Sequence, residues 1–412
     1  MAQLSDDCFA FGGALLPLAD ARARIVETFA CVADVEAVAP EAGRILAADV
    51  VAAIDLPPQT NSAVDGYAIR HADLTSGADT LLPVGSRVVA GEGRVSALAP
   101  GEAARVFTGA VLPEGADTVM MQEDCEERAG GVLIRPGIRA GANRRPAGED
   151  VAVGETALRA GHRLSPPDLA LLAALGLVRV PVRRALRVAI FSTGDELVDP
   201  PTPLGFGRVY DANRPMLSAM LSRLGVVVRD GGILPDEIEA TAEALGRAAE
   251  ANDLVITSGG VSTGEEDHVR VALARIGTLA FWRVAIKPGR PVAVGTIGPT
   301  PMIGLPGNPV AALVTFAALG RPLLDRLAGA EYVPPLRFSA PSGFAYRKRL
   351  GRREYVRVRL GDDGIARRFP KEGAGIITSL TQSDALMELP EDMTELAPGD
   401  MAPCIPLALL HG

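Results

Sequence analysis

The chain has 412 residues, 48% hydrophobic and 22% charged, which is enough apolar material for two to four domains with their own cores. The net charge of −9 argues against a nucleic-acid-binding protein, because such a protein needs a basic face to neutralise phosphates. A membrane protein is not expected either. The apolar run from Leu169 to Val178 has about half of the ~20 residues that a spanning helix needs, so it is interpreted as a core helix. The N-terminal segment carries acids where a signal peptide has basic residues, which favours a cytoplasmic protein.

The cysteine and histidine pattern does not predict a zinc or haem site. The four cysteines form no CxxC pair and the four histidines are equally scattered. Four cysteines in so long a chain also do not suggest a disulfide framework, so we expect buried thiols. The cysteines are Cys8, Cys31, Cys125 and Cys404.

The first part of the chain predicts a β domain inserted into a helical one. Residues 16–30 and 40–50 have the pattern of short helices, and a turn-rich segment follows at 54–70. From about 81 to 135 the sequence reads as short strands interrupted every eight to twelve residues by Gly or Pro. This pattern is typical of a small β-barrel or sandwich.

From residue 187 to about 329, strand-like and helix-like segments alternate. Such alternation indicates a doubly wound, mostly parallel α/β sheet. The expected strands are 187–192, 226–232, 253–260, 281–286, 291–295 and 302–307, and the expected helices are 215–225, 236–252, 267–277 and 308–320. Beyond residue 334, strands at 354–360, 365–370 and 399–407 predict a second small β domain.

The loops that follow the α/β strands carry the polar residues of the predicted site. Ligands of an open α/β sheet bind at the carboxyl ends of its strands, so these loops are expected to face one crevice. The segment Thr257–Gly260 (TSGG) precedes a helix and could offer backbone N–H groups to a phosphate. A plain tight turn explains the same glycines equally well.

Lys287 stands out because the chain contains only three lysines, the others being Lys348 and Lys371. It follows an apolar strand and precedes Pro288 and Gly289, where a compact ammonium group would suit a phosphate in a narrow crevice. The alternative is a solvated lysine at the end of a strand.

Acidic residues cluster in the same loops. Carboxylates about 4 Å apart repel by roughly 4 kcal/mol at an effective dielectric of 20, so a crevice that holds them together with a phosphate implies a divalent cation. Ligand sets made only of oxygen favour magnesium. Asp236 and Asp267 also precede helices and could instead be N-caps. The acids are Asp195, Glu196, Asp236, Glu265, Glu266 and Asp267.

Eight segments together carry a family resemblance. They are NSAVDGYA (61–68), VFTGAVLPEGADTVMMQE (106–123), RRPAGEDV (144–151), FSTGDELV (191–198), VYDANRPML (209–217), ITSGGVSTGEEDHV (256–269), IKPGRP (286–291) and GLPGNP (304–309). In order and spacing they resemble the molybdopterin molybdenumtransferase family, whose eukaryotic relatives include the C-terminal domain of gephyrin. The resemblance is close through residues 45–325 and weaker outside that range, where GRREYVRV (351–358) is the segment similar to the family.

The resemblance implies a multidomain α/β plus β fold in an elongated homodimer. Residues 1–55 and 147–183 would form a discontinuous helical/β domain, and residues 56–146 an inserted β domain. Residues 184–330 would form the doubly wound α/β molybdopterin-binding domain, and residues 331–412 a C-terminal β-barrel domain.

The implied reaction is magnesium-dependent cleavage of adenylylated molybdopterin, in which molybdate joins the dithiolene and AMP leaves. Contact with a molybdopterin adenylyltransferase is a further implied possibility. The expected catalytic residues are Asp65, Thr108, Asp150 and Glu196, and the expected magnesium ligands are Asp236, Asp267 and Glu196. The expected substrate-binding residues are Ser192, Thr193, Gly194, Asp195, Thr257, Ser258, Gly259, Gly260, Ser262, Lys287, Gly289, Arg290, Pro306, Gly307 and Asn308.

Three positions depart from the family pattern. Val64 stands where a methionine is usual, which we interpret as a packing change. Arg290 replaces the second lysine of KPGKP and keeps the charge with a different geometry. Ala374 falls where a serine is expected, so an anion contact from the C-terminal domain is expected to be missing.

Two other functions fit parts of the sequence. A molybdopterin adenylyltransferase is similar to residues 187–329 alone, but it lacks the flanking domains with their DGYA, FTGA and GEDV motifs. A non-catalytic pterin carrier or scaffold would not need the crevice acids, and the chain has no long linker. Molybdate insertion is therefore the preferred hypothesis.

Overall fold

The computed structural model describes residues 15–261 and 268–410. The chain divides into two compact units, which are described separately. The first contains Met1–Ala47, Gly161–Leu164 and Pro181–Gly412, and the second contains Ala48–Ala160 and Ser165–Val180. Within the described ranges, every helix is too short or too polar to cross a membrane.

The first unit contains the predicted doubly wound α/β domain. Its six-stranded sheet has the order β18-β15-β19-β23-β22-β20. The first four of these strands run parallel to one another, and β22 and β20 are added antiparallel. The strands are β15 (Arg187–Thr193), β18 (Val227–Leu234), β19 (Leu254–Ser258), β20 (Gly277–Trp282), β22 (Ala293–Ile297) and β23 (Thr300–Leu305). The mostly parallel sheet predicted from the βα alternation is thus confirmed.

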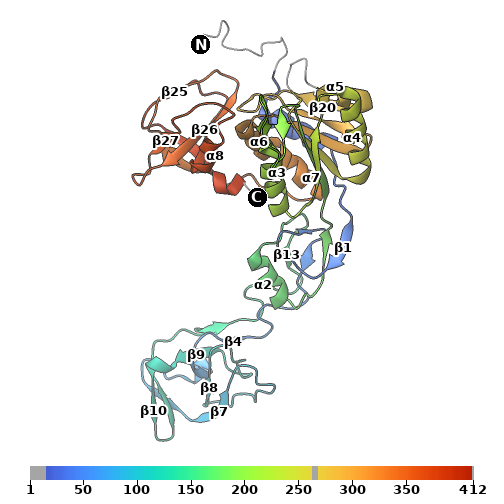
Figure 1. The fold of residues 1–412 in the computed structure, drawn as a ribbon. Coiled ribbons are helices and arrows are strands. Elements are labelled where there is room, and N and C mark those ends of the chain that lie inside the picture. The colour runs from blue at the N-terminus through green and yellow to red at the C-terminus, as the bar shows by residue number, and fades with distance from the viewer. Residues whose placement is uncertain (1–14, 262–267, 411–412) are drawn as a thin grey trace. The chain divides into compact units, whose positions relative to one another are not determined.

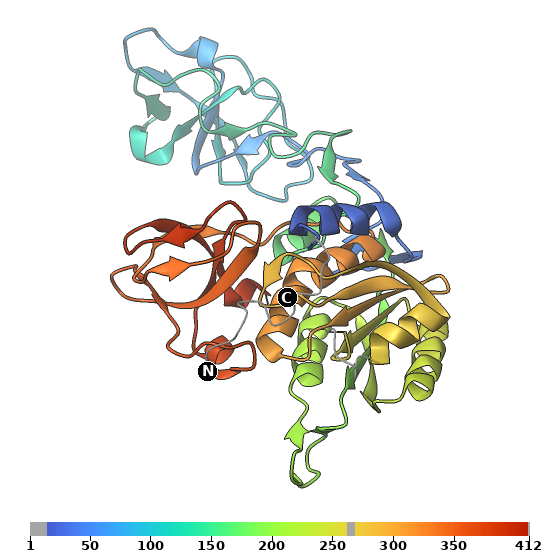
Figure 2. The same ribbon diagram turned by 90° about the horizontal axis from the view of Figure 1, so that it is seen from above.

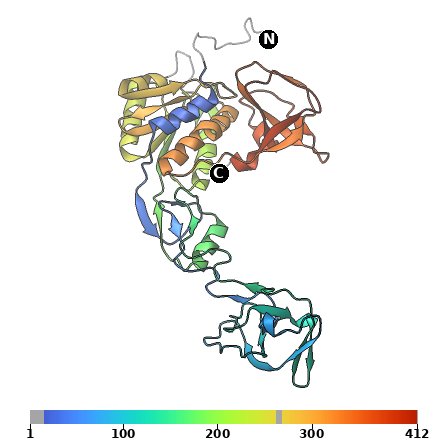
Figure 3. The same cartoon turned by 180° about the vertical axis from the view of Figure 1, so that it is seen from behind.

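Helices cover both faces of this sheet (Figure 1). Side chains alternate along each strand, so Val188 and Ile190 enter the core on the α3 side while Ala189 and Phe191 enter the core on the α4 side. Figure 3 shows α1 alongside α7 on the first of these faces. The helices are α1 (Leu18–Thr28), α3 (Asn213–Arg223), α4 (Ile238–Ala251), α5 (His268–Ile276), α6 (Pro309–Thr315) and α7 (Arg321–Ala328).

The helix expected to end at residue 320 continues further. A π-helical turn, Phe316–Gly320, joins α6 to α7, and Pro322 lies in the first turn of α7. Proline has no N–H for the carbonyl four residues earlier, which here belongs to Ala318. Nε of Arg22 in α1 donates to that oxygen at 3.0 Å instead. A side chain distant in sequence therefore satisfies the carbonyl that the proline leaves free.

Two secondary-structure predictions are wrong. Residues 40–50 do not form a helix, because Gly43 has φ +88° and Ile45–Leu46 are extended as β2, paired with β14 (Val180–Arg183). The strand expected at 281–286 is broken at Arg283, which has φ +65°. The chain then resumes as β21 (Ile286–Lys287), which belongs to a different sheet.

That second sheet belongs to the C-terminal β domain and has the order β21-β26-β28-β30-β24, with β27 also paired to β26. The α/β segment β21 is thus the edge strand of the C-terminal sheet. The three predicted strands form as β26, β27 and β30, and four further strands, β24, β25, β28 and β29, complete the domain. Its strands are β24 (Phe338–Pro341), β25 (Tyr346–Arg347), β26 (Arg353–Leu360), β27 (Ala366–Arg368), β28 (Ala385–Leu389), β29 (Glu395–Leu396) and β30 (Met401–Pro406), with a short helix α8 (Thr378–Thr381).

In the first unit, an excursion between β15 and α3 carries the short parallel pair β16 (Leu197–Val198) and β17 (Val209–Tyr210). Figure 2 shows it extending away from the layers of the α/β domain.

A small three-stranded sheet of β1 (Val35–Val38), β14 and β2 lies in the same unit.

The second unit is built of short strands around small apolar cores, as its sequence predicts. Its four-stranded sheet has the order β7-β8-β5-β9, and a three-stranded sheet has the order β10-β11-β6. The apolar run predicted as a core helix forms α2 (Pro166–Ala174), where Asp168 accepts hydrogen bonds from the N–H and Oγ of Ser165. The strands are β3 (Val50–Val51), β4 (Asn61–Ser62), β5 (Gly66–Ile69), β6 (Thr80–Leu82), β7 (Val84–Val88), β8 (Ala103–Val106), β9 (Thr118–Met121), β10 (Cys125–Arg128), β11 (Gly131–Ile134), β12 (Arg144–Arg145) and β13 (Thr156–Leu158).

The cysteines are less uniformly buried than predicted. Cys404 is buried, but Cys125 is only partly buried and Cys31 is exposed. All three are free thiols, and Cys8 lies outside the described residues. The prediction of a buried thiol is therefore wrong for Cys31, because α1 packs through Leu18, Ala21 and Ile25 and the cysteine follows beyond its end.

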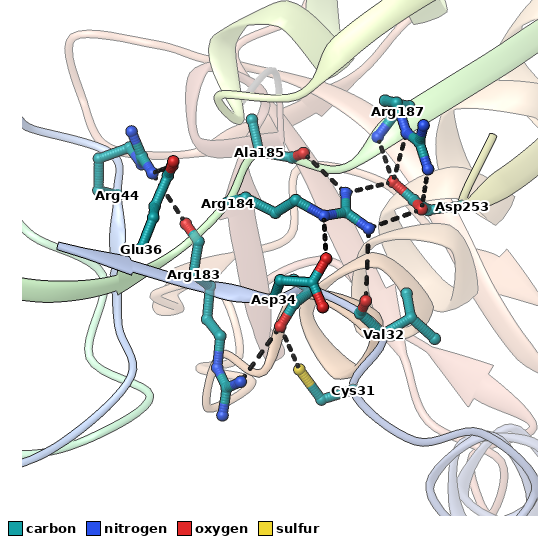
Figure 4. Close-up of polar contacts among 11 residues, drawn as sticks. Cys31, Val32, Asp34, Glu36, Arg44, Arg183, Arg184, Ala185, Arg187 and Asp253 are labelled. Atoms are coloured by element: carbon teal, nitrogen blue, oxygen red, sulfur yellow. Dashed lines mark hydrogen bonds and ion pairs between the residues drawn. The ribbon is translucent and has the colours of Figure 1, made fainter. Parts of the chain in front are cut away.

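An ion-pair network joins the start of the α/β sheet to the segment that leads into it (Figure 4). Asp253, just before β19, accepts hydrogen bonds from Nη1 and Nη2 of Arg184 at 2.7 and 2.9 Å and from the backbone N–H of Arg187 at 2.7 Å. Burial alone would raise the pKa of the Asp253 carboxyl, but the arginine hydrogen bonds outweigh it and hold the pKa well below its usual range. Asp34 binds the same Arg184 from the solvent side, with its side chain 85% exposed against 7% for Asp253.

We expect Asp253→Asn to lower the free energy of unfolding by about 2 kcal/mol at pH 7, the size of a lost charged hydrogen-bond set. The pKa of Asp253 in the folded state lies below the unfolded value of about 3.9. Its contribution is therefore complete above that value and is lost as the pH falls through the folded pKa. Urea unfolding of both proteins should show a difference at pH 7 that shrinks at pH 3. Asp34→Asn is the control and should cost less than about 0.5 kcal/mol; equal losses from the two variants would contradict this account.

Candidate active site

Buried hydroxyl groups without partners mark the carboxyl ends of the central strands. Ser192 and Thr193 end β15, and Thr257 lies near the end of the neighbouring β19. All three are buried, and their hydroxyl oxygens have no hydrogen-bond partner in the part of the chain that the structure describes. Buried polar groups are normally satisfied, so these three are suited to bind a ligand. These residues lie where the sequence predicts a crevice, and we call this group the strand-end crevice.

The glycines of this crevice are required by close packing. Gly259 and Gly260 have φ of +104° and +66°, and a Cβ on Gly259 would lie 2.6 Å from Oγ1 of Thr193. Gly194 has φ +138°, and the Glu196 carboxylate lies against it. The backbone therefore approaches the side chains of the crevice more closely than any other residue would allow.

One detail of the phosphate-loop prediction is wrong. The N–H of Gly259 donates to the carbonyl of Leu305 in β23 at 2.9 Å, so it is not available to a phosphate. The turn is instead tied to the neighbouring strand. Ser262, predicted to bind substrate, lies outside the described residues.

Asn213 connects the three loops of the crevice and was not predicted as a site residue. Its Nδ2 donates to Oγ of Ser258 at 2.8 Å and to the carbonyl of Gly307 at 2.6 Å, while its Oδ1 is buried without a partner. Oγ of Ser258 in turn donates to the carbonyl of Pro306 at 3.2 Å. Asn213 was missed because it starts α3 instead of following a strand, although it lies within the noted motif VYDANRPML.

Arg214 fixes the position of Asn213. It is buried and forms ion pairs with Asp199, Asp211 and Asp230, which come from the excursion, the start of α3 and β18. Oδ1 of Asp211 also accepts the backbone N–H groups of Asn213 and Arg214 at 3.1 and 3.2 Å. The start of α3 is thus held by charged groups below the crevice.

The structure brings Asp195 and Asp236 together in the loops that follow β15 and β18. The N–H of Asp195 donates to Oδ2 of Asp236 at 3.0 Å, and the N–H of Asp236 donates to Oδ1 of Asp195 at 3.2 Å. Asp236 is not an N-cap, because the residue at the cap of α4 is Glu237 and no side chain caps that helix. The capping alternative for Asp236 is therefore excluded.

The predicted magnesium ligands are only partly covered by the structure. Asp236 and Glu196 lie in adjacent loops, while Asp267 and the neighbouring Glu265 and Glu266 fall outside the described residues. Nδ1 of His268 lies 3.9 Å from Oδ1 of Asp236. Within residues 15–261 and 268–410, no group of three or more His, Cys, Asp or Glu side chains is arranged to hold a metal ion.

A cationic pocket of about 350 Å³ lies beside the crevice, between the α/β domain and the C-terminal β domain. Its lining includes Pro306, whose carbonyl accepts the hydrogen bond from Oγ of Ser258, and also Asn308 and Gly289. Two acids, Glu354 and Glu372, face six basic side chains across its walls. The basic residues are Lys287, Arg290, Arg352, Arg357, Arg368 and Lys371.

Arg357 is incompletely satisfied in the pocket, although Arg368 near it is paired with Glu372. Burial, and next the charge of Arg368, lower the pKa of Arg357, whose Nε is buried without a partner among the described residues. Its Nη2 donates to the carbonyl of Gly373 at 3.2 Å. Like charges held this close in a hollow favour an anion between them.

Lys287 reaches the pocket through the edge strand β21. Its parallel pairing with β26 sets Lys287 beside Glu354, and Nζ of Lys287 lies 3.2 Å from Oε2 of Glu354. Half of the lysine side chain, 52%, remains exposed. Lys287 is therefore neither a plain solvated lysine nor buried, and it contacts the C-terminal domain directly.

Three pocket residues bear on the departures noted in the sequence. Arg290 lines the pocket, so the charge expected from a second lysine is retained there. Ala374 also lines it and contributes only its carbonyl, which accepts the N–H of Val310 at 2.9 Å. The side chain at 374 cannot donate a hydrogen bond to an anion, as the sequence predicts. Val64, in the second unit, packs against an apolar cluster.

The sequence did not predict the pocket residues contributed by the C-terminal domain. Arg352 and Arg357 lie in the noted segment GRREYVRV, where alternating charges would have been a signal. Arg368 and Lys371 lie in a segment with no such pattern, and their approach to β21 depends on the sheet pairing.

In the second unit, two predicted catalytic residues lie together. Oδ1 of Asp65 accepts hydrogen bonds from the backbone N–H of Thr108 at 2.8 Å and from its Oγ1 at 2.9 Å. These two bonds hold the pKa of Asp65 below its usual value. The N–H of Asp150 donates to the carbonyl of Leu56 at 2.9 Å, and its carboxylate is exposed. Asp65 and Thr108 form one pair, and Asp150 is positioned by a different loop.

Comparisons with known proteins agree along the whole chain. Residues 16–176 match the MoeA N-terminal region (domain I and II), residues 189–326 match a probable molybdopterin binding domain, and residues 339–407 match the MoeA C-terminal region (domain IV). The molybdopterin molybdenumtransferase of Haemophilus influenzae is 37% identical over 90% of this chain and 93% of that protein. The molybdopterin molybdenumtransferase of a Nostoc species is 38% identical over 87% of this chain and 85% of that protein.

A solved structure shows the same architecture. The molybdopterin biosynthesis MoeA protein of Pyrococcus horikoshii has a TM-score of 0.82 and 31% sequence identity, covering 95% of this chain and 100% of that one. The α/β domain with flanking β domains is therefore shared over nearly the full length. On this similarity, the chain belongs to the molybdopterin molybdenumtransferase family, transferases of molybdenum cofactor biosynthesis.

Proposed function

We propose that this chain inserts molybdate into adenylylated molybdopterin. The phosphoanhydride bond of the substrate breaks, a water oxygen adds to the pterin phosphate or to AMP, and AMP leaves. As the two dithiolene sulfurs bind molybdenum, the oxygen displaced from molybdate leaves as water. The substrates thus bring a pyrophosphate and a tetrahedral dianion to one site.

The cationic pocket beside the crevice carries this proposal. The pocket is lined by six basic and two acidic side chains, and this excess of positive charge fits a tetrahedral oxyanion, either molybdate or a substrate phosphate. Pro306 lines the pocket and accepts a hydrogen bond from Ser258, the residue after Thr257, so the anion would be bound beside the end of β19. An adenylyltransferase built from the α/β domain alone would lack the four cations from the C-terminal domain, so molybdate insertion is favoured.

The residues of the strand-end crevice suit binding of the pterin and its phosphates. The hydroxyls of Ser192, Thr193 and Thr257 can donate hydrogen bonds to phosphate or pterin oxygens. The close approach of Gly259 and Gly260 to Thr193 brings the backbone of this turn next to one of these hydroxyls. Lys287 would hold the oxyanion from the side of the pocket.

We include magnesium in the proposal, held by Asp236, Glu196 and Asp267. The oxygen-only donor set fits a hard divalent cation, and the reciprocal hydrogen bonds between Asp195 and Asp236 hold the loops after β15 and β18 together. A bound magnesium ion would supply charge stabilisation to the leaving phosphate. Asp236 and Glu196 would also orient the attacking water by accepting its hydrogen bonds.

Three further parts of the proposal concern the second unit, assembly and location. The Asp65–Thr108 pair and Asp150 are proposed catalytic residues, because an ionised carboxylate held by a hydroxyl neighbour can orient a reacting group. We also propose a homodimer, a cytoplasmic location, and delivery of substrate by a molybdopterin adenylyltransferase.

Two assays separate the proposed function from its alternatives. Purified chain incubated with adenylylated molybdopterin, magnesium and molybdate should release AMP, whereas molybdopterin and ATP should not yield pyrophosphate. Pyrophosphate release would instead support an adenylyltransferase. Pterin binding without either product would support a carrier or scaffold.

A further inference from the structure

The cationic pocket contains a carboxylate that anion binding does not by itself explain. Glu354 lies on β26 in the pocket wall, and its side chain is 1% exposed. Burying a carboxylate costs free energy unless cations and hydrogen bonds compensate it, and a negative charge also repels any anion in the pocket. A residue with these two costs should have a use.

The polar contacts of Glu354 are made with other pocket residues. Oε1 accepts hydrogen bonds from Nε and Nη2 of Arg352 at 3.0 and 2.6 Å. Oε2 accepts a hydrogen bond from the hydroxyl of Tyr346 at 2.7 Å and lies 3.2 Å from Nζ of Lys287. Burial alone would raise the pKa of Glu354, but the hydrogen bonds from Tyr346 and Arg352 and the charge of Lys287 hold it below its usual value. The carboxylate is therefore ionised and bound to two cations.

These contacts restrict the direction of the Lys287 ammonium. Its Nζ lies 3.3 Å from the hydroxyl of Tyr346 and 5.8 Å from the centre of the tyrosine ring, in addition to its contact with Glu354. An ammonium has three N–H donors, so Glu354 and Tyr346 occupy two of them and leave one. Arg368 lies 4.9 Å from the centre of the same tyrosine ring.

We propose that Glu354, acting with Tyr346, is a positioning residue that directs the remaining N–H of Lys287 toward the oxyanion in the pocket. The identity of the anion, molybdate or a substrate phosphate, rests on the proposed function, whereas the coupling between Glu354 and Lys287 does not. Glu354 acts through Lys287 and does not itself touch the substrate.

Replacing Glu354 with glutamine would have two opposing effects on anion binding. It would remove a negative charge from the pocket, which strengthens the attraction for an anion. It would also remove the acceptor that holds Lys287, which weakens binding by loss of a directed charged hydrogen bond. The charge effect occurs with or without Lys287, whereas the loss of the acceptor matters only when Lys287 is present. A double-mutant cycle with Lys287→Met separates them.

The test measures the dissociation constants of inorganic phosphate and of molybdate by calorimetry for the full chain and its variants. Lys287→Met should weaken binding of at least one of the two anions about tenfold. The anion whose affinity falls more is the one that Lys287 contacts. For that anion, Glu354→Gln in the wild-type background should change binding by less than about threefold. In the Lys287→Met background the same change should tighten binding about fivefold, since only the charge effect remains. Equal effects of Glu354→Gln in both backgrounds, or no binding of either anion to the wild type, would overturn the proposal.

Two more variants test whether Glu354 only stabilises the C-terminal domain. Tyr346→Phe keeps the ring and removes the hydroxyl, so it should weaken binding about threefold in the wild type and have no effect once Lys287 is replaced. It remains informative if Glu354→Gln does not fold, and a similar weakening in both backgrounds would contradict the proposal. Glu388→Gln is the matched control. Glu388 is a buried carboxylate on the neighbouring β28 that binds Arg337 and Arg353 at 2.6 and 2.8 Å and is not part of the pocket lining.

Glu388→Gln should lower thermal stability, and its effect on anion binding should be the same with and without Lys287→Met. If its effect instead depends on Lys287 as strongly as that of Glu354→Gln, any buried charge in this domain produces the coupling, and the proposal is contradicted. These binding measurements need no turnover. Failure of the wild type to insert molybdate would therefore reject the proposed function alone, and absence of coupling would reject this inference alone.

Discussion

Asp236→Ala is expected to reduce AMP release by at least about a hundredfold, because the proposed site would lose a magnesium ligand and an acceptor for the attacking water. The fold should be little affected. The Asp236 side chain caps no helix, and its hydrogen bond from the N–H of Asp195 is worth about 1 kcal/mol. Rates of AMP release at several magnesium concentrations, with thermal melts of the same samples, measure both effects.

Glu239→Ala is the control for this prediction. Glu239 lies one turn further along the same region, is exposed, and forms an ion pair with Arg275 at 2.7 Å on the surface. Its loss should leave AMP release unchanged. The metal interpretation of Asp236 is wrong if Asp236→Ala melts early but turns over normally when folded.

Lys287→Ala should weaken binding of adenylylated molybdopterin by about 1.5–3 kcal/mol if its ammonium contacts a substrate phosphate, the usual cost of a lost charged hydrogen bond. Molybdate binding at saturating pterin would then be nearly unchanged. If the pocket takes molybdate instead, the loss should appear in the molybdate affinity. Calorimetry with each substrate distinguishes the two cases, and unchanged affinity for both would remove Lys287 from the site.

Arg347→Ala is a suitable control for the loss of positive charge. Arg347 follows Tyr346, is exposed, and pairs with Glu395 at 3.1 Å away from the pocket lining. A general effect of net charge on anion affinity would appear in both variants, whereas a specific contact affects only Lys287.

The sequence predicted the α/β domain well because its signals are local. Strands and helices alternate, and each strand end carries its polar loop, so the positions of Ser192, Thr193 and Thr257 follow from topology alone. The periodicity failed at residues 40–50, where apolar residues at helical spacing pair with β14 as a strand. Local pattern could not reveal that pairing, because the partner lies far away in the sequence.

The cationic pocket could be predicted only in part for the same reason. Lys287 and Arg290 follow an α/β strand and were recognised, but β21 pairs with β26 of another domain. That pairing places Glu354, Arg357 and Tyr346 around Lys287. The pairing of β21 with β26 depends on the positive φ of Arg283, which breaks the preceding strand. An arginine does not indicate a positive φ, so the sequence could not predict this break.

Molybdate dependence of AMP release is the most direct test of the central claim that this chain inserts molybdate. Wild-type protein would be incubated with adenylylated molybdopterin and magnesium, with and without molybdate, and AMP and active cofactor would be measured. Both products should appear together, and their formation should require molybdate. Release of AMP at the same rate without molybdate, or no release under any condition, would contradict it.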